Sequence, residues 1–198
     1  MSTPVLLVHG IDDTSARLET MRASLQSRGL GPVHCMDLSP SDGSISLQAM
    51  GEQVKQQTLS LREACGVAKI DIVAYSMGAL AARWFLQELG GHASVRRFIS
   101  VAGPHHGTLT AYLRSAVGTR QMRPRSPDLR HLNSLAWGDV EVYSFWSPLD
   151  LMVIPATSAL LEEAQNRSML VAFHRWMITD KRVLSAVCDV LADRKSVV

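Results

Sequence analysis

Ser76 stands where a serine can act as a nucleophile. Residues 70–78 read Ile-Asp-Ile-Val-Ala-Tyr-Ser-Met-Gly, so a strand-like run leads into Ser76 and helix-forming residues follow it. Such a sharp strand–turn–helix junction needs small residues two positions to either side of the serine, and Ala74 and Gly78 supply them. The start of the helix also offers the backbone N–H of Met77 to a developing negative charge. The pattern predicts a catalytic serine, with an ordinary helix-capping serine as the alternative that the motif alone leaves open.

A second backbone donor is expected after the first strand-like run. This run ends in His9-Gly10-Ile11, and Gly10 lets the backbone approach closely at that joint. In enzymes with this kind of serine junction, a second N–H group for the oxyanion comes from a loop after an early strand. We therefore expect Ile11 and Met77 to form the oxyanion hole. We expect His9 to brace the loop by hydrogen bonds, because the catalytic base of such enzymes follows the acid in the chain.

Asp150 and His174 are the expected partners of Ser76. The order along the chain in such enzymes is serine, acid, histidine. The apolar run Val140–Trp146 predicts a strand, and the turn with Asp150 follows it at the carboxyl end, where the catalytic groups of open α/β sheets gather. Only one histidine, His174, comes after Asp150. His174 is therefore the predicted base and Asp150 the acid that orients it.

Other acids could take this place, and Asp150 has a simpler possible role. Asp150 could cap a turn. Asp139 precedes its strand and should lie at the wrong edge of the sheet, and Asp128 has no strand before it. Position and order therefore favour Asp150 over both.

These side chains need a parallel sheet to position them. Short apolar runs rich in Val and Ile alternate with stretches of helical period, which predicts one α/β domain over residues 1–198 with a mostly parallel sheet, flanking helices and little or no cap domain. The predicted strands are Val5–Val8, Val33–Leu38, Ile70–Ala74, Arg97–Ala102, Val140–Trp146 and Met169–Ala172. The helical faces are Leu18, Met21 and Leu25; Leu47, Met50, Val54 and Leu61; Leu80, Trp84 and Leu89; and Leu184, Val187 and Leu191.

Four segments together resemble the small bacterial lipases and esterases of the α/β-hydrolase superfamily. They are Val5–Gly10 (VLLVHG), Ala74–Gly78 (AYSMG), Gly103–Thr108 (GPHHGT) and Ser147–Asp150 (SPLD), and the resemblance runs from Pro4 to about Val190.

The resemblance implies a triad of Ser76, Asp150 and His174, with oxyanion donors at Ile11 and Met77. It implies that the two histidines of GPHHGT shape a loop below the site. The chain departs from most relatives at Tyr75, where they carry His, and at Ala79, where many carry a second glycine. Tyr75 puts the local hydrogen bonding and the substrate preference in doubt, but not the nucleophile.

Composition limits the other classes of function. With 20 Lys and Arg against 18 Asp and Glu, the net charge is +2, too small a basic excess for a general nucleic-acid binder. The three cysteines, Cys35, Cys65 and Cys188, are too scattered for a disulfide framework or a zinc site, and no metal or cofactor is expected. The first residues lack the pattern of a signal peptide and no run is long enough for a membrane span, so we expect a cytoplasmic protein.

The predicted function is hydrolysis of carboxylic esters through an acyl-enzyme, with a small-molecule or lipid ester, such as an acylglycerol, as the substrate. An acyltransferase or a thioesterase uses the same triad, and a non-catalytic hydrolase-fold binding module is the alternative from another class. A missing triad member or a spoiled junction would have favoured the binding module, and neither is found.

The segment Leu109–Asn133 must pass near the predicted pocket, because it follows a strand whose carboxyl end faces the site. Leu109, Tyr112, Leu113 and Val117 could share one short amphipathic helix, and prolines at 124 and 127 prevent a long one. The segment holds five arginines against one acid: Arg114, Arg120, Arg123, Arg125 and Arg130, with Asp128. They form either a solvated basic surface or a rim that makes transient contact with an anionic membrane or lipid surface.

Overall fold

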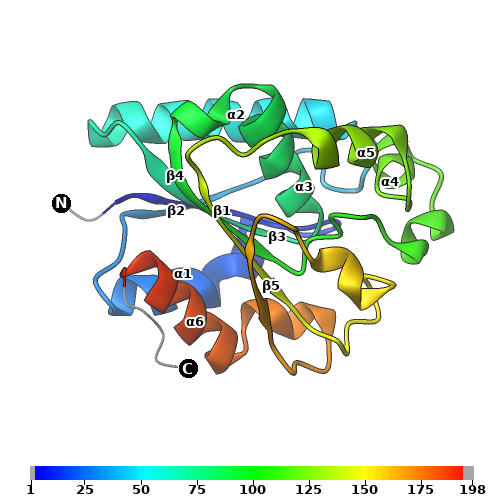
Figure 1. The fold of residues 1–198 in the computed structure, drawn as a ribbon. Helices are drawn as coiled ribbons and strands as arrows, with labels where there is room; N and C mark the ends of the chain where they lie inside the picture. Colours follow the sequence, from blue (N-terminus) through cyan, green and yellow to red (C-terminus); the bar gives the residue numbers. More distant parts are fainter. Residues whose placement is uncertain (1–2, 194–198) are drawn as a thin grey trace.

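Six parallel strands form the centre of the molecule (Figure 1). The computed structural model describes residues 3–193. The sheet has the order β2-β1-β3-β4-β5-β6. The strands are β1 (Val5–Val8), β2 (Val33–Met36), β3 (Ile70–Tyr75), β4 (Val95–Val101), β5 (Glu141–Trp146) and β6 (Gln165–Ser168). The order of the strands reverses between β1 and β3, and a crevice opens at the carboxyl ends of strands at such a point.

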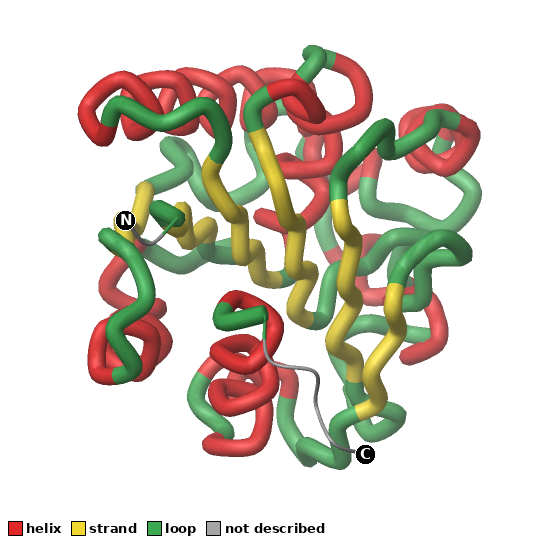
Figure 2. The backbone as a smooth tube through the Cα atoms, turned by 60° about the vertical axis from the view of Figure 1, so that its left-hand side comes forward, coloured by secondary structure: helices red, strands yellow, loops and turns green. Residues whose placement is uncertain are grey.

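Helices cover both faces of this sheet, as parallel sheets require (Figures 1 and 2). The α-helices are α1 (Glu19–Ser27), α2 (Leu47–Cys65), α3 (Met77–Arg83), α4 (Val117–Gln121), α5 (Pro127–Ser134) and α6 (Lys181–Leu191). The 3₁₀ helices are Ser15–Leu18, Gly91–Ala93, Leu109–Leu113, Ala156–Ala159 and His174–Ile178, and a π-helical segment, Trp84–Glu88, continues α3. In Figure 1, α2, α3, α4 and α5 lie above the sheet, and α1 and α6 lie below it.

Alternation along each strand divides the apolar side chains between two cores. Leu6 and Val8 of β1 pack with the side chains of α2 and α3, whereas Val5 and Leu7 pack with those of α1 and α6. All four are at most 1% exposed. Successive side chains of a strand point to opposite faces, so a strand that is covered on both faces needs the near-continuous apolar sequence that β1 has.

The predicted α/β fold and parallel sheet are confirmed, and five of the six predicted strands lie within two residues of their predicted ends. The sixth prediction is wrong: β6 is Gln165–Ser168, and Met169–Ala172 is the loop that follows. β6 pairs with β5 alone and is largely exposed, so its sequence need not be apolar. An apolar run therefore could not identify this edge strand.

The predicted helix through Leu109 and Val117 is also corrected. A 3₁₀ helix ends at Leu113, the backbone is extended at Arg114, and α4 begins only at Val117. Pro127 then begins α5, where its missing N–H costs no helical hydrogen bond. The ends of the predicted domain, residues 1–2 and 194–198, lie outside the described residues. Among residues 3–193, no helix combines the length and the apolar character that a membrane span needs.

The layer below the sheet gives a test of this core. Leu25 of α1 is fully buried, whereas Leu59 on the outer face of α2 is 40% exposed. We expect Leu25→Ala to lower the free energy of unfolding by about 2–5 kcal/mol, because it leaves a cavity. Leu59→Ala should change it by no more than about 0.5 kcal/mol. Urea unfolding measures both, and equal losses would contradict this assignment of the core.

Candidate active site

Ser76 forms the turn between β3 and α3 in a strained conformation. Its φ and ψ angles are +53° and −124°, and few residues other than glycine adopt a positive φ. The neighbouring backbone comes very close. A Cβ atom at Gly78 would lie 2.2 Å from the carbonyl oxygen of His9, and one at Gly10 would lie 3.0 Å from the Cβ of Ser76. The turn therefore exists because glycines stand at both points of close contact.

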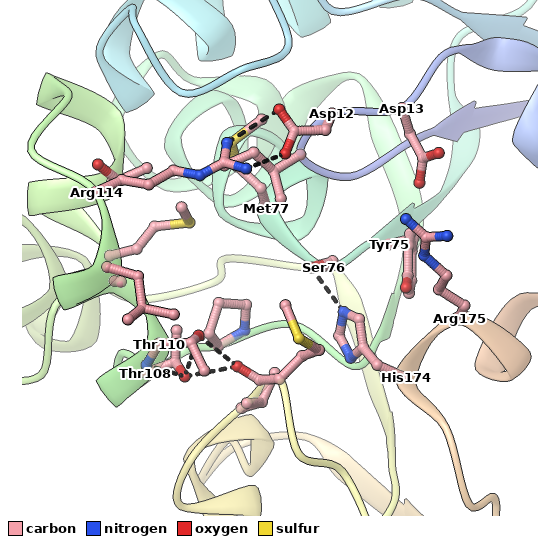
Figure 3. Close-up of a pocket in the computed structure, with 18 residues that line it drawn as sticks. Asp12, Asp13, Tyr75, Ser76, Met77, Thr108, Thr110, Arg114, His174 and Arg175 are labelled. Atoms are coloured by element: carbon pink, nitrogen blue, oxygen red, sulfur yellow. Dashed lines mark hydrogen bonds and ion pairs between the residues drawn. The ribbon is translucent and has the colours of Figure 1, made fainter.

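The structure brings Ser76, His174 and Asp150 into one chain of hydrogen bonds (Figure 3 shows the first). The Nε2 atom of His174 lies 2.9 Å from the Oγ of Ser76, and its Nδ1 lies 2.6 Å from an Oδ of Asp150. Asp150 lies in the turn after β5, and His174 begins a 3₁₀ helix beyond β6. All three side chains lie at the carboxyl edge of the sheet, and each residue is at most 9% exposed.

The backbone around Asp150 favours its ionised form. Its second carboxylate oxygen accepts hydrogen bonds from the N–H groups of Met152, at 2.8 Å, and Val153, at 3.0 Å. Burial by itself raises the pKa of Asp150. The hydrogen bond and charge interaction with His174, together with the two backbone N–H groups, outweigh it and hold the pKa below its ordinary value. A carboxylate in this state can fix the imidazole tautomer and stabilise an imidazolium.

Two backbone N–H groups beside Ser76 are available to an oxyanion. Ile11 follows the close contact at Gly10, and Met77 is the first residue of α3. Both residues line the cavity in front of Ser76. Within residues 3–193, neither N–H group donates to a protein acceptor. The positions of these two groups therefore fit the predicted oxyanion hole.

Two of the other histidines are structural. His9 is fully buried; its Nδ1 donates to the carbonyl group of Gly10 at 2.8 Å, and its Nε2 accepts from the N–H of Leu38 at 2.9 Å. It thus braces the loop after β1, as expected. His105, from the GPHHGT segment, is also fully buried, and its Nε2 lies 2.7 Å from the Oγ of Ser100. Burial and the nearby Arg83 keep the pKa of His105 well below its usual range, so its ring is neutral.

The alternative acids do not join the site. Asp139 lies just before β5, so the length of that strand separates it from the carboxyl edge. Asp128 lies on α5, where it accepts hydrogen bonds from the side-chain amides of Gln48 and Gln121.

A cavity of about 300 Å³ opens in front of Ser76 (Figure 3). The segment after the GPHHGT loop supplies one wall, and the loops that carry Asp150 and His174 supply another. The surface of the cavity is mainly apolar, and its apolar lining residues include Ile11, Met77, Pro104, Ala111, Leu113, Met122, Met152 and Val153. Such a cavity suits an apolar group such as an acyl chain. In residues 3–193, no group of three or more His, Cys, Asp or Glu side chains could hold a metal ion.

Exposed apolar side chains are concentrated in the loops that line this cavity. Of ten large hydrophobic residues that are exposed in the described chain, nine come from the three loop segments at this edge of the sheet. They are Leu109, Tyr112 and Leu113; Leu149, Leu151 and Met152; and Leu170, Phe173 and Trp176. Exposed apolar patches on one part of a protein surface are typical of interaction sites.

Two charged features of the cavity mouth are not among the residues predicted from the sequence as site residues. Arg114 binds Asp12 across the mouth, with its Nη1 3.0 Å from an Oδ of Asp12 (Figure 3). No sequence pattern signals this pair, because 102 residues separate its members. The second feature is Arg175, which also lines the cavity. Its position directly after His174 could have identified it.

The fold and the chain order of the site define an α/β-hydrolase. The model of the palmitoyl protein thioesterase family matches residues 4–140, well over half of the 198 residues. The chain therefore belongs to the palmitoyl protein thioesterase family. The predicted resemblance to hydrolases of the lipase and esterase type is confirmed.

Solved structures share the fold at low sequence identity. The mature lipase BlEst2 of Bacillus licheniformis superposes with a TM-score of 0.81 at 15% identity, over 96% of this chain and 92% of that one. Lipase B of Aspergillus fumigatus superposes with a TM-score of 0.80 at 18% identity, over 96% of this chain and 52% of that one. A monoacylglycerol lipase of Paleococcus ferrophilus superposes with a TM-score of 0.72 at 12% identity, over 98% of this chain and 97% of that one. Among curated protein sequences, none matches the chain.

The contact at Gly78 gives a test of this geometry. Gly78→Ala should destabilise the protein by about 1–3 kcal/mol, because its Cβ collides with the His9 carbonyl group. It should also lower kcat on an ester by about 100-fold, because it displaces the N–H of Met77 and the Oγ of Ser76.

Gly66 provides the matched control, because its φ is +62° and no atom lies within 4 Å of a Cβ added there. Gly66→Ala should cost about 1–2 kcal/mol of stability and leave kcat unchanged. A Gly78→Ala protein with wild-type kcat would contradict the argument.

Proposed function

We propose that this protein hydrolyses carboxylic esters through an acyl-enzyme on Ser76. The observation that carries the proposal is the chain of hydrogen bonds from Ser76 through His174 to Asp150, 2.9 and 2.6 Å long, at the edge of a largely apolar cavity. Membership of a thioesterase family supports a hydrolase. A complete triad next to a cavity argues against a non-catalytic binding module.

Each group has one task in the proposed reaction. His174 Nε2 accepts the proton of Ser76 as its Oγ attacks the carbonyl carbon, and Asp150 holds the Nδ1–H and stabilises the imidazolium. The N–H groups of Ile11 and Met77 stabilise the oxyanion, and one such donor is typically worth about 10²–10³ in rate. His174 returns the proton to the leaving alcohol. Water then attacks the acyl-enzyme in the same manner and releases the acid.

The proposed substrate is a lipid ester such as an acylglycerol. The apolar lining of the cavity supports an acyl chain, and the nine exposed apolar residues around it support transient contact with a lipid surface. The names of the structural neighbours agree with this class, since two are lipases and one is a monoacylglycerol lipase. Of the arginines between 109 and 133, Arg114 is paired with Asp12 and Arg123 stacks on the ring of Tyr112, 4.7 Å away. Both contacts are within the protein, so the apolar residues are the main support for surface contact.

Thioester hydrolysis is the second candidate, and the family match favours it. The triad and the oxyanion donors serve either substrate, because the tetrahedral intermediate has the same oxyanion. Rates on an oxygen ester and a thioester with the same acyl chain separate the two candidates.

The triad should behave as one unit in kinetics. Ser76→Ala and His174→Ala should each lower kcat on p-nitrophenyl esters by about 10⁴-fold or more, and the double variant should lose little more, because both residues act on one proton transfer. Asp150→Asn should lose about 10⁴-fold, because it presents the wrong imidazole tautomer.

Asp139→Asn is the matched control for the acid. Asp139 is exposed and lies at the other end of β5, so its variant should keep wild-type kcat. If the losses in the Ser76 and His174 variants multiplied in the double variant, or if Asp139→Asn were the more damaging acid variant, the assignment would be wrong.

A further inference from the structure

Arg175 is the one charged residue of the cavity lining that has no ionic partner among the described residues. The lining contains Asp12, Asp13, Arg114 and Arg175 besides His174. Asp12 is paired with Arg114, and Asp13 accepts from the Nε of Arg17 at 2.9 Å. Arg175 is exposed and makes no hydrogen bond or ion pair within residues 3–193. Its guanidinium group is therefore free to bind an anion.

The position of Arg175 relates it to one half of the substrate. In the mechanism proposed above, the same His174 Nε2 that accepts the Ser76 proton returns it to the leaving group. The alcohol or thiol half must therefore lie on the His174 side of Ser76. Figure 3 shows His174, Tyr75 and Arg175 on that side, with the Thr108–Arg114 segment across the cavity. Arg175 thus flanks the leaving half, and the apolar wall of Ala111, Leu113 and Met122 remains for the acyl half.

The acids near Arg175 already have partners of their own. The ring of Tyr75 packs against His174 with centroids 5.0 Å apart, and burial raises the pKa of its hydroxyl group, so the ring stays neutral. Asp13, which Figure 3 draws beside Arg175, accepts a hydrogen bond from Arg17 through one carboxylate oxygen, so its charge is balanced by Arg17. Asp150 is behind His174 and its oxygens bind His174 and two backbone N–H groups.

We propose that Arg175 determines specificity by binding a phosphate or carboxylate group on the alcohol or thiol half of the substrate. The inference rests on the proposed ester or thioester hydrolysis and names its substrate class. A planar guanidinium group binds such oxyanions through two parallel hydrogen bonds, which an ammonium group matches only in part. Together, the two walls of the cavity fit an acyl compound that is apolar at one end and anionic at the other.

Two pairs of soluble substrates test this inference and separate the sources of the anion. Octanoylglycerol phosphate is compared with octanoylglycerol, and octanoyl coenzyme A with octanoyl-N-acetylcysteamine, all below the concentrations at which micelles form. The quantity measured is the ratio of kcat/KM for the anionic member to that for the neutral member.

The wild-type ratio should exceed one in at least one pair. Arg175→Gln should lower it by about 3- to 10-fold, as expected for one partly exposed charged contact, and added salt should reduce the difference. Arg175→Lys should keep part of the preference. Lys181→Gln removes one positive charge from an exposed site on α6 outside the cavity lining and should keep the wild-type ratio. If Arg175→Gln lowers the kcat/KM ratio in the glycerol pair alone, the leaving half is phospholipid-like. If it lowers the ratio in the thiol pair alone, the leaving half is a phosphate-bearing thiol.

The two proposals fail in different ways. Hydrolysis of the neutral members with no anionic preference, or a preference that Arg175→Gln leaves intact, overturns the role of Arg175 and spares the proposed function. Failure of the wild-type protein to hydrolyse any of the four compounds overturns the proposed function, and the role of Arg175 with it.

Discussion

The close contact between α3 and the end of β1 is the constraint on which the site depends. β1 and β3 are neighbours in the sheet, so the turn at Ser76 must fit against the loop after β1. It fits because Gly78 has no Cβ to collide with the His9 carbonyl group, and Gly10 has none to collide with the Cβ of Ser76. His9 in turn secures that loop through Gly10 and Leu38. The same contact brings Ser76 and the proposed oxyanion donors, Ile11 and Met77, to one cavity before any substrate arrives.

The other half of the site comes from loops beyond the last two strands. Asp150 follows β5, and His174 follows the edge strand β6. The two halves meet through the hydrogen bond between His174 and Ser76, across 98 residues of sequence. In the proposed mechanism, a tight turn thus provides the nucleophile and the oxyanion donors, while longer loops provide the base and the acid; these loops also carry most of the exposed apolar residues. Substrate preference can change in these loops without disturbing the turn.

The sequence predicts the buried parts of this structure well, for a physical reason. Strands that are covered on both faces must be largely apolar, as in β1 and, apart from Asp71, in β3. A serine between such a strand and a helix needs small neighbours. The order of serine, acid and histidine along the chain then predicts Asp150 as the acid and His174 as the base. Prediction is weaker where no burial constrains the sequence. β6 lies at the edge and is polar, so its position was mistaken. The ion pair between Arg114 and Asp12 and the unpaired state of Arg175 depend on how exposed loops meet, which no local pattern encodes.

Ser76 is the proposed nucleophile, and the most direct test of that role locates a covalent adduct. The native protein is treated with a fluorophosphonate ester, digested and analysed by peptide mass spectrometry. One adduct is expected, on the peptide that contains Ser76, and none after prior denaturation, because only the folded turn activates the hydroxyl group. An adduct on a different residue of the native protein, or no adduct at all, would contradict the role of Ser76.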